Sequence, residues 1–188
     1  RRSLDWLERC RAKGLPIYGQ TGTVRTGFAF TLEHWNLYDA SPAWRELTTG
    51  TKQEKLKKMR NPALREAVKE EAEEADRRLQ VIQAGVGGSI PGLLVQSVND
   101  QSSLEQYVGK SLGQIAEEEN KTPIDVMLDL SLAGDLNVEF LGPNRGFNAQ
   151  YMAEMINDSD YTVPGVSDGG AHTKFFTGGA FTTDFLHW

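Results

Sequence analysis

The side chain best placed to do chemistry in this sequence is Asp168. It follows a short apolar segment, residues 161–167, that is typical of a β-strand, and two glycines come directly after it. In parallel α/β proteins the carboxyl ends of the strands face the binding site, so a carboxylate there is well placed for catalysis. The alternative is a turn in which Asp168 caps the backbone amides that follow it. The spacing alone leaves both interpretations open.

Four further residues could line the same pocket. Gly169 and Gly170 let the backbone turn sharply without a side chain that crowds the pocket. His172 lies four residues beyond the acid, within reach of a substrate or of Asp168 itself. Gln20 ends another predicted strand, and by analogy with parallel barrels its side chain is expected at the same pocket. We therefore predict that these four residues bind substrate.

The sequence holds no complete motif for binding a metal ion. There is no H-x-H, no H-E-x-x-H and no C-x-x-C. The histidines His34, His172 and His187 are far apart, and Cys10 is the one cysteine. A complete metal site is therefore not expected from the residues of this chain alone.

The elements that must position these side chains alternate between helix and strand. Apolar spacing and capping signals predict helices at residues 1–14, 42–47, 52–78 (broken at 61–62), 111–118, 123–132, 147–156 and 182–188. Extended segments are predicted at residues 15–20, 79–86, 93–98, 136–141 and 161–167. This order favours an α/β fold with a parallel sheet. A closed (β/α)8 barrel needs about 250 residues, so this chain could supply about half of one.

Composition excludes several classes of protein. The net charge of −6 argues against nucleic acid as a partner, and no stretch approaches the length of a membrane span. A single cysteine favours a reducing compartment, and we predict a cytoplasmic location. Residues 52–78 carry seven acids and nine bases, which nearly cancel. This segment is therefore predicted to be a solvated helical pair and not a basic docking patch.

Residues 165–172, Gly-Val-Ser-Asp-Gly-Gly-Ala-His, resemble the last barrel strand of the D-aminoacylase-like branch (N-acyl-D-amino-acid deacylases) of the amidohydrolase superfamily. Shorter segments resemble the same branch, at residues 42–44, 61–65, 107–112, 115–116 and 123–126. The resemblance runs over most of the chain, and Ser-Asp-Gly-Gly-Ala-His is its most specific part.

The resemblance implies a metal-dependent amidohydrolase, which acts on carbon–nitrogen bonds other than peptide bonds. Residues 1–188 would form a single fragment of its (β/α)8 TIM-type barrel, roughly the last half. It implies that a zinc-bound water attacks the carbonyl of an N-acyl amide and that Asp168 is the general base. A role for Asp168 as a metal ligand is also open.

The chain departs from the family pattern in its metal ligands. The histidine pair of the first strand, the bridging ligand and the later histidines have no counterpart here, so most zinc ligands are expected to lie outside this chain. The arginine that grips the substrate carboxylate in some relatives has no match, and Lys174 is the nearest cation. We therefore expect the chain to be cut from a larger protein and to be inactive by itself.

Two other functions stay open. The same strand ends could hold a small ligand without catalysis, with the aromatic segment 28–38 as the binding surface. A phosphate-binding protein that uses the glycine-rich stretch 85–89 is less favoured, because that stretch lacks the Lys of a P-loop. Half a barrel would leave open sheet edges, so we predict that a partner chain, another copy of the chain, a nearby helix or a missing segment covers them.

Overall fold

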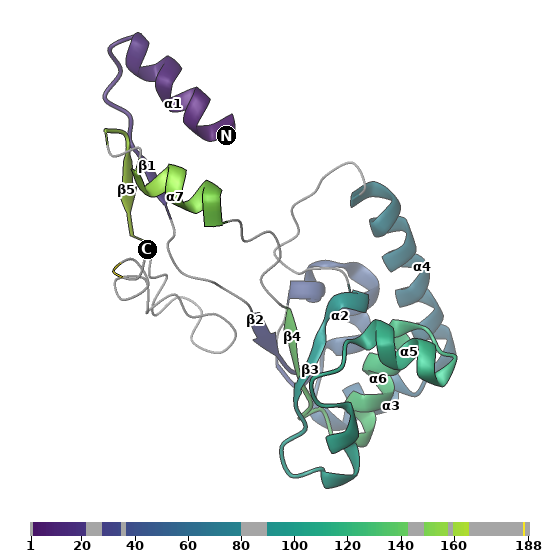
Figure 1. Ribbon diagram of the computed structural model, residues 1–188. Helices are drawn as coiled ribbons and strands as arrows, with labels where there is room; N and C mark the ends of the chain where they lie inside the picture. The colour runs from purple at the N-terminus through teal and green to yellow at the C-terminus, as the bar shows by residue number, and fades with distance from the viewer. Residues whose placement is uncertain are drawn as a thin grey trace. The chain divides into compact units, whose positions relative to one another are not determined.

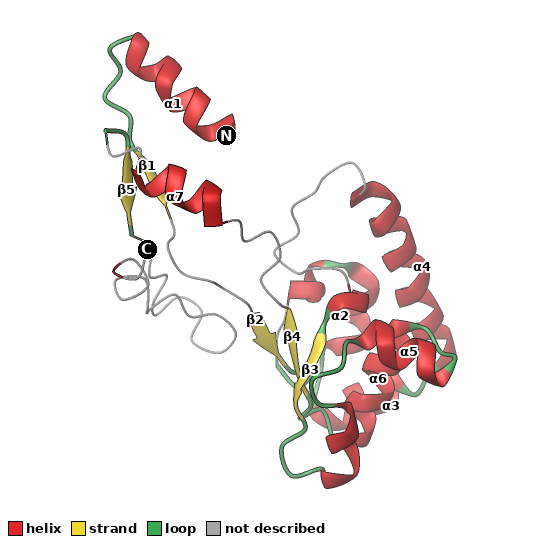
Figure 2. Ribbon diagram, viewed as in Figure 1, coloured by secondary structure: helices red, strands yellow, loops and turns green. Residues whose placement is uncertain are grey.

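The computed structural model describes residues 2–21, 28–34, 37–79, 90–142, 149–157, 160–165 and 186. They form a mixed α/β structure, which agrees with the α/β class, whereas the partial (β/α)8 barrel stays a prediction (Figure 2). The chain divides into two compact units. Unit 1 consists of Arg1–Gly27 and Asn144–Trp188, and unit 2 consists of Phe28–Pro143. Unit 2 is therefore an insertion within unit 1. That all 188 residues belong to one barrel fragment stays a prediction.

Unit 1 contains two helices and two strands among its described residues: α1 (Arg2–Ala12), β1 (Gly19–Thr21), α7 (Ala149–Asn157) and β5 (Thr162–Pro164). Helix α1 buries Leu4, Leu7 and Cys10, which recur every third residue on one face. The helix ends near Gly14, whose φ of 70° is in the left-handed region that glycine adopts without strain. The first strand begins at Gly19, four residues later than the apolar pattern predicts.

Strands β1 and β5 pair in parallel, although the whole of unit 2 separates them in the sequence. Figure 1 shows the purple β1 beside the yellow-green β5. Gln20 is opposite Val163, and Thr21 is opposite Pro164. The parallel pairing expected from the alternation of helix and strand is confirmed for these two strands.

Unit 2 contains most of the described elements. They are β2 (Phe28–Phe30), η1 (Leu37–Ala40), α2 (Pro42–Thr48), α3 (Lys52–Met59), α4 (Pro62–Leu79), η2 (Ile90–Gly92), β3 (Leu94–Ser97), η3 (Ser102–Tyr107), α5 (Leu112–Glu119), α6 (Pro123–Ala133) and β4 (Glu139–Gly142). The three strands form a sheet in the order β2-β4-β3.

The sheet of unit 2 is antiparallel, so the expectation of a parallel sheet is wrong for this unit. The physical reason lies in the connection from β3 to β4. Two helices, α5 and α6, follow β3 before β4 begins. Residues 109–112 run back beside β3, and the N–H of Leu112 donates to the carbonyl of Leu93, so α5 begins at the start of β3. Helices α5 and α6 then lead to β4, whose first residue, Glu139, pairs with Ser97 at the end of β3. The next strand therefore runs the other way.

The core of unit 2 lies between one face of this sheet and the helices. Phe30, Val95 and Phe140 are neighbours across the three strands and are all buried. The ring of Phe30 lies 5.9 Å from that of Phe140 and 5.7 Å from that of Tyr38, and Tyr38 lies 5.2 Å from Trp44. Tilted rings at these separations pack favourably. The aromatic segment 28–38 therefore contributes to the core of unit 2.

Local capping interactions start several helices of unit 2. Thr51 and Ser111 both form capping boxes, with Glu54 and Gln114 respectively. The Asn61-Pro62 step separates α3 from α4, which confirms the predicted break. Two predicted elements lie outside the described residues: the strand at 79–86, apart from Leu79 at the end of α4, and the helix at 182–188, apart from Leu186.

The two ends of unit 2 meet in the structure. Phe28, the first residue of β2, is the antiparallel partner of Gly142, the last residue of β4. Paired residues on neighbouring antiparallel strands have Cα atoms about 4.5–5.5 Å apart. An insertion with adjacent ends disturbs its host little, because the host chain leaves and returns at nearly the same point.

We expect unit 2, excised as residues 28–143, to fold by itself. It has its own buried core and ends that lie side by side. Circular dichroism should show helical content, and urea should unfold the excised unit in one cooperative transition. A gradual loss of signal without a transition would contradict the division into two units.

None of the helices among the described residues is long and apolar enough to cross a membrane.

Candidate functional site

The carboxyl ends of β1 and β5 lie side by side in unit 1. The carbonyl of Thr21 at the end of β1 accepts a hydrogen bond of 2.9 Å from the N–H of Gly165, the residue after β5. Gly165 is buried and has a φ of 138°, a conformation that residues with a Cβ atom rarely adopt. The chain thus turns out of β5 at a position where glycine is required.

The two helices of unit 1 contact the same face of this strand pair. A Cβ atom at Gly19 would lie 2.9 Å from Cδ1 of Leu7, so α1 packs closely against β1 there. Thr162, the strand partner of Gly19, donates through its hydroxyl to the carbonyl of Met155 in α7. Side chains alternate along a strand, so Gln20 and Val163 project from the opposite face.

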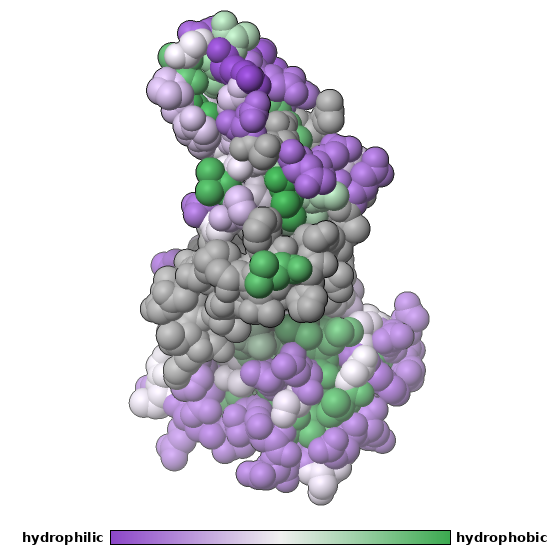
Figure 3. All heavy atoms as spheres, turned by 60° about the vertical axis from the view of Figure 1, so that its left-hand side comes forward, coloured by the Kyte–Doolittle hydropathy of each residue, from purple (hydrophilic) through white to green (hydrophobic). Residues whose placement is uncertain are grey.

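That opposite face is exposed. Gln20 is exposed, and Val163 is 52% exposed although it is apolar. Among the described residues, exposed large apolar side chains are concentrated in unit 1, where they are Trp6, Leu15, Tyr18, Tyr151, Val163 and Leu186, against Val108 in unit 2. Figure 3 shows hydrophobic side chains, in green, at the surface among the hydrophilic ones. Parallel sheets are normally covered on both faces, so the Gln20 face is of the kind that another element usually covers.

Of the site residues predicted from the sequence, the structure describes only Gln20. It lies one residue before the carboxyl end of β1, which agrees with its predicted position at a strand end. Asp168, Gly169, Gly170 and His172 lie outside the described residues. The structure therefore brings together the strands that lead to the predicted site.

No group of three or more His, Cys, Asp or Glu side chains that could hold a metal ion occurs among the described residues. Cys10 is buried on the packed face of α1, as a small core residue. The fit of the chain to a metal ion therefore depends on Asp168 and on groups beyond the described residues.

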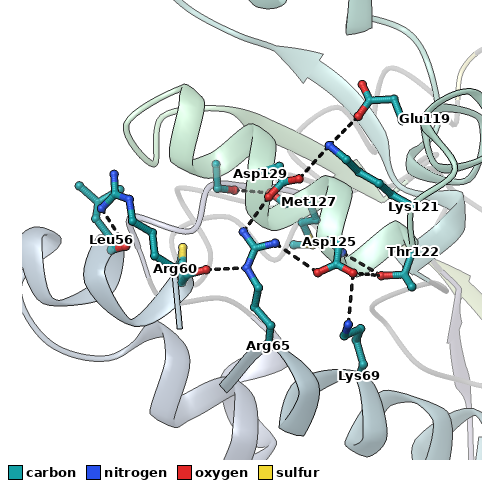
Figure 4. A network of polar contacts seen from close by, with 12 residues as sticks. Leu56, Arg60, Arg65, Lys69, Glu119, Lys121, Thr122, Asp125, Met127 and Asp129 are labelled. Carbon is teal, nitrogen blue, oxygen red and sulfur yellow. Dashed lines mark hydrogen bonds and ion pairs between the residues drawn. The ribbon is translucent and has the colours of Figure 1, made fainter. Parts of the chain in front are cut away.

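A second cluster of ionisable side chains lies in unit 2, between α4 and α6 (Figure 4). Arg65 donates to Asp125 at 3.2 Å and to Asp129 at 2.7 Å, and its Nε donates to the carbonyl of Met59 at 2.6 Å. Lys69 reaches Asp125 at 3.3 Å, and Lys121 reaches Asp129 at 3.0 Å. Each carboxylate is thus shared by two cations.

The pKa values of two acids in and beside this cluster are lowered. Burial pushes the pKa of Asp125 upward, but hydrogen bonds from Thr122, Lys69 and Arg65 outweigh it and hold that pKa below its usual value. At the edge of the cluster, a hydrogen bond from Tyr107, followed by one from Lys121, lowers the pKa of Glu119. These acids stay ionised near neutral pH, which suits ion pairs and not proton transfer.

The cluster therefore ties α4 to α6 and is not a catalytic site. The sequence analysis did not single out Arg65 or the two acids that it contacts, Asp125 and Asp129. A signal was present, because two acids four residues apart on a largely buried helix require a cation from another element.

Comparison with protein-family models, with curated proteins and with solved structures finds no match to this chain. The resemblance to the D-aminoacylase-like branch therefore stays a prediction.

Proposed function

We propose that this chain is part of a metal-dependent hydrolase that acts on carbon–nitrogen bonds other than peptide bonds, with N-acyl amides as its substrates. The observation that carries the proposal is the parallel pairing of β1 with β5. Strand β5 leads to Asp168, the predicted general base, within four residues of Pro164. Ligands of parallel α/β proteins bind at the carboxyl ends of the strands, and Asp168 comes shortly after the carboxyl end of β5 in the sequence.

The arrangement of unit 1 supports a section of a (β/α)8 barrel. Its two strands are parallel neighbours, and both helices contact one face, which leaves Gln20 and Val163 on the other. Helices outside and a strand face inside is the arrangement of such a barrel. We propose that unit 1 belongs to roughly the last half of one, and that Gln20, Gly169, Gly170 and His172 contact the substrate.

Asp168 would act on the attacking water. When bound, a zinc ion polarises the amide carbonyl and lowers the pKa of a bound water towards neutrality. A carboxylate oxygen of Asp168 would accept a proton from the water as the water oxygen bonds to the carbonyl carbon. The same carboxyl would return the proton to the leaving nitrogen as the carbon–nitrogen bond breaks. The products are a carboxylic acid and an amine.

The exposed Gln20 face of unit 1 is the reason to propose that another element covers it. A two-stranded sheet is marginal in water without further packing, and parallel strands are usually buried on both faces. We propose that further strands of the same barrel, or another copy of the chain, cover the Gln20 face. The single cysteine is consistent with the cytoplasm as the proposed location.

Metal removal tests the proposed function. The full-length protein that carries this chain should release free amine from N-acetyl-D-amino acids. After treatment with a chelator that strips the metal, turnover should fall to background, and added Zn²⁺ should restore it.

Metal analysis before and after treatment is the control, since it shows whether the chelator acted. Undiminished turnover by metal-free protein would overturn the metal-dependent assignment. A protein that binds N-acyl amides without hydrolysing them would support the alternative of a non-catalytic ligand-binding domain.

A further inference from the structure

Helix α3 and the residue after it carry a concentration of positive charge. Residues 52–60 contain five bases and one acid, whereas the chain as a whole has a net charge of −6. Most acids that offset these bases in the sequence lie in α4, from Glu66 onward. The cancellation expected over residues 52–78 therefore does not hold along α3 itself.

Only some of these cations have carboxylate partners. Lys52 pairs with Asp135 at 2.7 Å and Lys58 pairs with Glu46 at 3.1 Å. The buried Lys55 donates to the backbone carbonyl of Glu33. These three cations are therefore already engaged within unit 2.

Lys57 and Arg60 remain available. The side chain of Lys57 has no hydrogen bond or ion pair with any described residue. Arg60 contacts only the carbonyl of Leu56, through Nη1 (Figure 4), and both side chains are exposed. The other guanidinium nitrogens of Arg60 are free to donate, and a guanidinium can hold a carboxylate with two parallel hydrogen bonds.

These two cations border an open groove of about 580 Å³ where α3 meets α4. Its lining residues are Glu54, Lys57, Lys58, Arg60, Asn61, Pro62 and Leu64. The one acid, Glu54, turns a carboxylate oxygen towards Thr51, whose N–H and hydroxyl donate to it at 2.7 and 2.8 Å. Pro62 and Leu64 add an apolar part to the lining. The groove thus combines free cations with apolar surface.

We propose that this groove binds a short acidic peptide segment of a partner protein. Carboxylates of the segment would contact Lys57 and Arg60, and an apolar side chain would lie over Pro62 and Leu64. A lone phosphate would fill little of the groove and would leave this apolar surface unused. This inference does not depend on the proposed hydrolase activity.

The test uses the fluorescein-labelled peptide Glu-Leu-Glu-Glu-Leu-Glu, to which the full chain is added in increasing amounts at low ionic strength. Fluorescence anisotropy of the peptide measures binding. The double variant Lys57→Glu and Arg60→Glu should weaken binding at least 10-fold. The matched control, Arg9→Glu and Lys13→Glu, makes the same change of charge at exposed positions of unit 1 and should bind like the wild type. Binding should also weaken as salt is added, because salt screens exposed charges.

Three results would overturn the proposal. The first is that the wild type does not bind the peptide. The second is that the groove variant and the control lose affinity equally, which would point to net charge alone. A labelled single-stranded oligonucleotide of equal charge could bind more tightly than the peptide, which would replace the peptide by a nucleic acid. Circular dichroism of both variants shows that exposed substitutions leave the fold intact.

Discussion

Replacing Asp168 with Asn is expected to lower kcat for N-acyl amide hydrolysis by about 10²–10⁴-fold, the usual contribution of a positioned general base. Asparagine has nearly the same size and shape but cannot accept the proton of the attacking water. The measurement is release of free amine by the full-length protein, as wild type and as variant, at saturating substrate. KM should change little, because the lost interaction acts mainly in the transition state.

Asp160→Asn is the matched control. Asp160 lies just before β5, its side chain is 68% exposed, and its ion pair with Arg11 is long, at 3.5 Å. This variant should keep wild-type turnover. Metal content distinguishes the two roles open to Asp168, because a general-base variant keeps its metal and a ligand variant loses part of it. Wild-type turnover by Asp168→Asn would refute the assignment of this residue as the base.

Replacing Arg65 with Met is expected to lower the free energy of unfolding by about 2–3 kcal/mol. Arg65 is 17% exposed and contacts two acids, of which Asp125 is 20% exposed. Methionine fills similar space but leaves both carboxylates with one cation fewer. A charge that loses its partner in a half-buried position costs more than an exposed ion pair contributes. Urea unfolding of the full chain measures the change.

The control for this prediction is Arg60→Met, the same substitution at an exposed arginine that contacts a single carbonyl. It should change stability by less than about 0.5 kcal/mol. The pKa of Asp125 is a second readout, and it should rise in Arg65→Met because a donor to its charged form is lost while burial remains. Equal stability of the two variants would contradict the role given to Arg65.

Residues close together in the sequence determined where the helices of unit 2 begin. Thr51 with Glu54, Ser111 with Gln114 and the Thr122-Pro123 step each satisfy or pre-set the first turn of a helix from within a few residues. Such signals need no tertiary structure, and the helix starts predicted at residues 52, 111 and 123 lie within one residue of those in the structure.

Ser41 shows the limit of these local signals. It occupies the N-cap position of α2, but its side chain makes no cap hydrogen bond. Glu71 of α4 accepts the N–H of Ala43 instead, at 2.6 Å. Packing of α4 against α2 thus supplied a cap that the sequence around Ser41 did not reveal.

Strand pairing was decided by the tertiary structure alone. The sequence predicts the extended segments but contains no local signal that β1 pairs with β5 across all of unit 2, or that β2, β4 and β3 form an antiparallel sheet. A strand carries the same alternation of side chains whichever strand it pairs with, so its partner is chosen by packing and by the connections. The position of Gln20 beside β5, and the joining of Arg65 to Asp125 and Asp129, follow from contacts between residues distant in sequence. Those contacts form only when the helices and strands pack together.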